Sequence, residues 1–100
     1  MTKLLDLITP GDVLYEEFMK PLNISQNLLA RDLDVPPSRV HAIIHGRRSI
    51  TADMALRLGK YFKTSAQMWI NLQAHYDLEL VERNSWPKIK DRVRVFKIAS

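Results

Sequence analysis

His41 and His45 come closest to a chemical site, because two histidines four residues apart on a helix can hold a zinc ion. The segment HAIIH lacks the glutamate of the metalloprotease motif, and no third ligand is evident in the sequence. The chain also has no cysteine and no glycine-rich phosphate loop. We therefore predict a protein that is not an enzyme and that requires neither a metal ion nor a cofactor.

Both histidines belong to a short segment with a polar, partly basic outer face. Over residues 37–45 the inner positions hold Val40 and Ile43, and the outer positions hold Pro37, Ser38, Arg39, His41, Ala42 and His45. A helix with such a face can enter the major groove of DNA, which is about 12 Å wide. The alternative is an ordinary solvated helix face.

The residues around this segment favour DNA binding. A short helix over residues 25–33 precedes it through a turn of about three residues, too short to let the two helices lie antiparallel. Ala30 is small where the helices would pack, Val35 can plug the core from the turn, and Gly46 ends the second helix. We predict a helix-turn-helix whose readout helix spans residues 37–45.

Five helices are expected in all, the first starting near residues 10–12 and the last ending before residue 84. The residues that signal their starts are Asp12, Ser25, Pro37, Thr51 and Ser65. Ser25, Thr51 and Ser65 are good N-cap residues. Aromatic and apolar side chains at helical spacing in the fifth helix are expected in the core. The alternative for Trp69, Leu72 and Tyr76 is a contact between two copies of the chain.

The chain changes character after Asn84. Ser85-Trp86-Pro87 reads as a break, and residues 88–100 carry five basic residues against one acidic residue. We predict a helix-turn-helix domain over residues 1–84 and a basic extension, extended or partly ordered, over residues 85–100. The extension is either solvated or an arm that contacts a partner or DNA.

Length and composition fit one small all-α domain. The chain has 100 residues, of which 46% are hydrophobic, and its net charge is +4. No apolar run approaches the roughly 18–20 residues that span a bilayer, and the N-terminus lacks the features of a signal peptide. We expect a cytoplasmic protein with no membrane partner, and the basic balance suits an anionic partner such as nucleic acid.

With the segment SQNLLARDLDVPPSRVHAIIHGRRSIT, the chain resembles the Cro/repressor-like (XRE) helix-turn-helix family. More closely, the segments TPGDVLYEEFMKPLNIS and IHGRRSITADMALRLGKYFKTSAQMWINLQAHYDLELV are similar to the HigA/VapI-type antitoxins. The resemblance covers residues 9–84 and implies a five-helix, lambda-repressor-like fold. It places Gln26, the first residue of the second helix, on a phosphate. It places Pro37, Ser38 and Arg39 against bases, followed by His41 and Ala42, although Pro37 departs from the polar residue usual there. Arg47 and Arg48, just past the readout helix, suit phosphate contacts, the alternative being a solvated basic pair.

The resemblance also implies partners. A homodimer would bind a palindromic operator, repress the operon and neutralise a cognate RNase toxin of the RelE/HigB type. The alternative is a stand-alone regulator without a toxin. An RNase needs a positive surface to hold RNA, and such a surface repels a basic tail. We therefore expect the toxin to contact Glu16 and Glu17 on the first helix, and not the tail.

Overall fold

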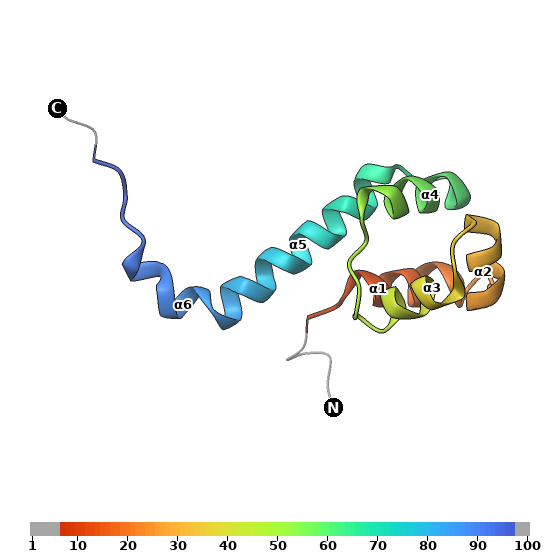
Figure 1. The fold of residues 1–100 in the computed structure, drawn as a ribbon, viewed down its shortest axis with the longest axis horizontal. Helices are drawn as coiled ribbons and strands as arrows, with labels where there is room; N and C mark the ends of the chain where they lie inside the picture. Colours follow the sequence, from red (N-terminus) through yellow and green to blue (C-terminus); the bar gives the residue numbers. More distant parts are fainter. Residues whose placement is uncertain (1–6, 98–100) are drawn as a thin grey trace.

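The computed structural model describes residues 7–97, and within them every regular element is helical (Figure 1). The elements are α1 (Pro10–Val13), the π-helical η1 (Leu14–Met19), α2 (Gln26–Leu33), α3 (Pro37–Ile44), α4 (Ala52–Phe62), α5 (Ala66–Asn84), α6 (Trp86–Ile89) and the 3-10 helix η2 (Lys90–Arg92). Because η1 directly continues α1, these two form one helical segment, and the predicted all-α fold with five main helices is confirmed.

Local capping chemistry starts the helices. The Ser25 and Ser65 hydroxyls accept from the backbone N–H groups three residues on, at 3.1 and 3.0 Å, and Pro37 is the first residue of α3, as predicted. The predicted N-cap Asp12 is wrong. Thr9 caps α1, and the Asp12 carboxylate accepts from the Thr9 N–H at 3.1 Å to complete a capping box. The reason is Pro10. A proline fits the first position of a helix, so the N-cap is the residue before it, Thr9.

A single core joins α1–η1 through α5. Its fully or nearly fully buried apolar side chains are Leu14, Met19, Leu29, Ala30, Leu33, Val40, Ile43, Ile50, Met54, Ala55, Leu58 and Trp69. Trp69 is 0% exposed, and its ring lies 4.9 Å from that of Phe18 between centroids. Trp69 is therefore a core residue, and the alternative that it forms a contact between copies is wrong.

Gly11 lets α1 lie directly on the backbone of α3. A Cβ atom at Gly11 would clash with the Ile43 carbonyl oxygen and would lie 2.9 Å from the Ile44 Cα. Only glycine permits this approach, since the obstructing atoms are backbone. The readout segment is thus seated on α1 as well as on α2.

The second half of α5 leaves the body of the fold (Figure 1). The buried residues of this helix, Trp69 and Gln73, both lie in its first half. After a bend at Ser85 the chain forms α6 and η2, and then runs extended from Val93. The predicted break at Ser85-Trp86-Pro87 is a bend followed by a new helical turn, because Pro87 at the second position of α6 needs no N–H donor there.

No helix among residues 7–97 is long and apolar enough to cross a membrane.

Candidate nucleic-acid interface

The turn between α2 and α3 has the three-residue length that the sequence predicted. Asp34 adopts a left-handed conformation at φ 60°, and the Val35 N–H donates to the Ala30 carbonyl oxygen at 3.0 Å. The Val35 side chain packs against the core, and Ala30 is fully buried at the helix contact. A turn this short keeps α2 and α3 from lying antiparallel, and it leaves one face of α3 outward.

A residue of α4 holds this turn from outside. The Arg57 guanidinium Nη1 donates to the carbonyl oxygens of Leu33 at 2.7 Å and Asp34 at 3.2 Å, and its Nε donates to Asp53 at 2.9 Å. These carbonyls end α2 and have no helical partner, so Arg57 satisfies them with a charged donor. Sequence analysis missed Arg57, because the contact joins residues more than twenty positions apart.

The predicted readout face points to solvent. Pro37, Ser38 and His41 are exposed, while Arg39 and Ala42 are half-buried. Val40 and Ile43, on the opposite side of α3, are buried in the core. The structure therefore leaves Pro37, Ser38 and His41 accessible, and Arg39 and Ala42 accessible in part.

Gln26 stands beside this face at the first turn of α2. Its Oε1 atom lies 3.3 Å from the His41 Nδ1 atom. The His41 ring lies 4.2 Å from that of His45, between centroids, at an interplanar angle of 47°. Gln26 and the readout helix thus form one polar surface, a contact that the sequence did not predict.

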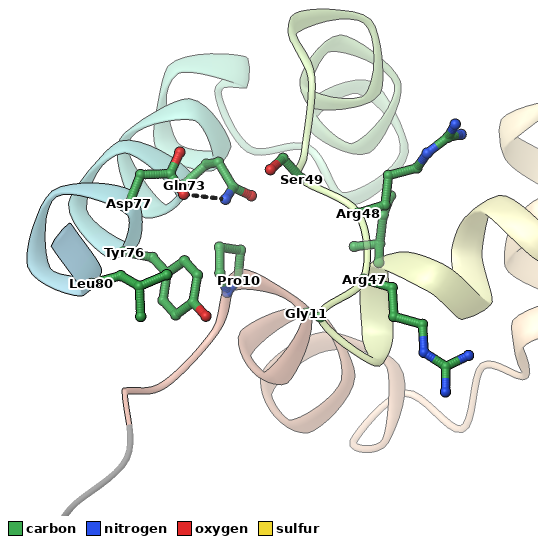
Figure 2. Close-up of a pocket in the computed structure, with 11 residues that line it drawn as sticks. Pro10, Gly11, Arg47, Arg48, Ser49, Gln73, Tyr76, Asp77 and Leu80 are labelled. Atoms are coloured by element: carbon green, nitrogen blue, oxygen red, sulfur yellow. Dashed lines mark hydrogen bonds between the residues drawn. The ribbon is translucent and has the colours of Figure 1, made fainter. Parts of the chain in front are cut away.

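Arg47 and Arg48 are exposed on the loop after α3. The Arg47 N–H donates to the Ala42 carbonyl oxygen at 2.8 Å, which ties the loop to the end of the readout helix. Gly46 adopts φ 73° and allows this reversal. In Figure 2 both guanidinium groups extend away from the cleft beside α5, so they are free to meet a phosphate backbone.

The profile of the Helix-turn-helix family matches residues 16–69. The chain belongs to this family. Virulence-associated protein I of Dichelobacter nodosus is 48% identical over 77 residues, which cover 77% of this chain and 71% of the relative. The Pseudomonas aeruginosa antitoxin HigA, solved with the higBA promoter, is 41% identical with a TM-score of 0.85, over 90% of this chain and 98% of that one.

A second solved structure has a similar fold. The antitoxin GraA in complex with its operator is 36% identical with a TM-score of 0.87, over 94% of this chain and 95% of that one. The resemblance to HigA- and VapI-type members of the helix-turn-helix family, stated from the sequence, is confirmed by these relatives.

In this helix-turn-helix chain a cleft of about 220 Å³ lies between the start of α1, the loop after α3 and the middle of α5. Gln73 lines it and is 9% exposed (Figure 2). Its Oε1 atom accepts from the Ile50 N–H at 2.8 Å, and its Nε2 atom donates to Asp77 at 3.0 Å. Gln73 therefore fixes the loop that carries the two arginines. Sequence analysis missed it, although a polar residue four positions after buried Trp69 was a usable signal.

The described residues hold no cluster of metal-ligating side chains, and the shifted pKa of Tyr61 belongs to a structural contact. Among residues 7–97 no three or more histidine and acidic side chains gather as a metal site. Burial, with a hydrogen bond to Asp32, raises the pKa of Tyr61 above its ordinary value. Tyr61 donates to the Asp32 carboxylate at 2.9 Å, which joins α4 to α2 away from the readout face.

Proposed function

We propose that this chain is a sequence-specific DNA-binding antitoxin that acts in the cytoplasm without catalysis or cofactor, represses its own operon and neutralises a cognate RNase toxin of the RelE/HigB type. The observation that carries the DNA-binding part is the exposed outer face of α3, seated on α1 at Gly11 and flanked by Gln26 and the loop arginines. Relatives named as antitoxins and solved with a promoter or an operator support the proposal.

Each polar residue of the interface has a proposed task. Gln26, Arg47 and Arg48 position the protein through phosphates, which carry no sequence information. Ser38, Arg39 and His41 read base edges in the major groove, with Pro37 and Ala42 giving apolar contact there. The net charge of +4 adds a general attraction to DNA.

Fluorescence anisotropy with duplex DNA tests this division. The probe is the segment upstream of the chain's own reading frame, with a scrambled duplex of equal length beside it. We expect the natural segment to bind more tightly and Ser38→Ala with Arg39→Ala to erase that difference. Equal binding of the two duplexes by the wild-type protein would refute sequence-specific recognition.

Two copies are needed for useful specificity, since one short helix reads only a few base pairs. We propose a homodimer on two half-sites about one helical turn, or roughly 34 Å, apart. The protruding half of α5 supports this assembly, because Leu78 is 63% exposed and Val81 49% exposed there. Leu72 and Tyr76 are half-buried on the same helix. Sedimentation equilibrium of the wild-type protein and of a variant with Leu78→Glu and Val81→Glu tests the proposed dimer. A wild-type protein that sediments as a monomer would refute it.

The first helix is the proposed toxin-facing element. Glu16 and Glu17 are exposed on η1, and they line a groove together with Ile8, Asp12 and Val13. A partner that holds RNA presents positive charge, which this groove would attract and the basic tail would repel. Co-purification with the product of the neighbouring reading frame tests the toxin part. A neighbouring frame that encodes no small basic protein would favour the stand-alone regulator instead.

A further inference from the structure

The Gln26 contact decides which ring nitrogen of His41 carries the proton. An amide oxygen only accepts hydrogen bonds, and the Gln26 Oε1 atom lies 3.3 Å from the His41 Nδ1 atom. With the Gln26 Oε1 atom facing Nδ1, the tautomer that makes this hydrogen bond carries its proton on Nδ1. Its other nitrogen, Nε2, keeps a lone pair and is an acceptor.

This acceptor lies on the readout face. His41 is exposed, and its Nδ1 edge is occupied by α2 through Gln26. The His45 ring packs beside it from the next turn of α3 at 4.2 Å. Nε2 is the ring nitrogen that remains for a ligand on the outer face of the helix.

We infer that His41 is a specificity-determining residue that selects a base with an amino group in the major groove, and that Gln26 is the positioning residue that fixes this choice. This inference rests on the proposed DNA binding. In the major groove the N6 amino group of adenine and the N4 amino group of cytosine donate, whereas guanine N7 and O6 and thymine O4 only accept. An acceptor at His41 Nε2 pairs with the first two bases. Gln26 therefore shapes sequence choice without touching a base.

In vitro selection from a randomised duplex pool tests the inference with the full chain. His41→Ala locates the base pair whose identity depends on His41. We expect the wild-type protein at about pH 8 to prefer adenine or cytosine there by about fivefold, the size of one net hydrogen bond. Without the Gln26 acceptor neither tautomer of His41 is favoured, so Gln26→Ala should erase the preference.

Two matched variants separate positioning from affinity. Gln26→Glu keeps an acceptor at the same place, so it should weaken binding to all duplexes and leave the base preference intact. Arg48→Ala should do the same through a lost phosphate contact. Three results would overturn the inference: a His41-dependent preference that survives Gln26→Ala, a preference for guanine at pH about 8, or no His41-dependent position among the enriched sequences. If the wild-type protein enriches no sequence at all, the proposed DNA binding itself fails.

Discussion

Replacing Gly11 by alanine tests how the readout helix is held in place. The added methyl group would clash with the Ile43 carbonyl oxygen and lie 2.9 Å from the Ile43 carbonyl carbon, so α1 and α3 must move apart. Both obstructing groups are backbone and cannot rotate away. We expect a loss of about 3 kcal/mol in the free energy of unfolding, the upper end for overpacking in a tight core. For a domain of this size each kilocalorie lowers the melting temperature by roughly 4–8 °C.

Thermal unfolding followed by circular dichroism measures the loss, and anisotropy with duplex DNA measures its effect on binding. Gly59→Ala is the matched control. Gly59 also lies in a helix, but its added Cβ would lie 3.0 Å from the nearest atom, the Ala66 backbone nitrogen. A shift of a few tenths of an ångström relieves that contact, and alanine is the better helix former. If Gly11→Ala were no more destabilising than Gly59→Ala, the close packing of α1 on the α3 backbone would not be what holds α3 in place.

Three further changes address binding, the toxin and pH. Arg48→Ala should weaken binding to natural and scrambled duplexes alike and lower the slope of log K against log salt by about 0.9, and a changed base preference would contradict its phosphate role. Glu16→Lys with Glu17→Lys should abolish co-purification with the toxin, whereas truncation after Asn84 should not, and the reverse pattern would identify the tail as the neutralising element. Because burial raises the folded-state pKa of Tyr61, its stabilising effect is complete below the unfolded value and fades as pH rises through the folded value. Denaturant titrations above about pH 10 should therefore show stability falling in the wild-type protein, and less steeply in Tyr61→Phe.

Short-range chemistry was readable from the sequence. Ser25 and Pro37 mark helix starts because each acts within one turn of its own position. Gly46 was readable for the same reason, since the left-handed residue that ends a helix favours glycine. The inward face of α3 followed from the spacing of Val40 and Ile43.

Contacts between distant residues were not readable. The Gln26–His41 contact, the Arg57 donors on the α2 end and the Gln73 bond to Ile50 all depend on how helices cross. The burial of Trp69 was predicted as one of two alternatives, because helical spacing alone does not say which neighbour covers an apolar face. The roles assigned to the predicted DNA-contacting residues stay predictions, and two of these residues, Arg39 and Ala42, are half-buried.

In the proposed homodimer on DNA, the protruding half of α5 would act as a lever whose stiffness sets how precisely distance along the duplex is measured. Residues 74–84 extend over about 16 Å at the helical rise of about 1.5 Å per residue. A tilt of about 10° at the point where α5 leaves Gln73 would move its tip by about 3 Å, close to the rise of one base pair, about 3.4 Å. In a pair of chains joined at these tips the two tilts add. In that proposed assembly the Gln73 bond to the Ile50 backbone, at the root of the lever, would govern how strictly the spacing of two half-sites is measured.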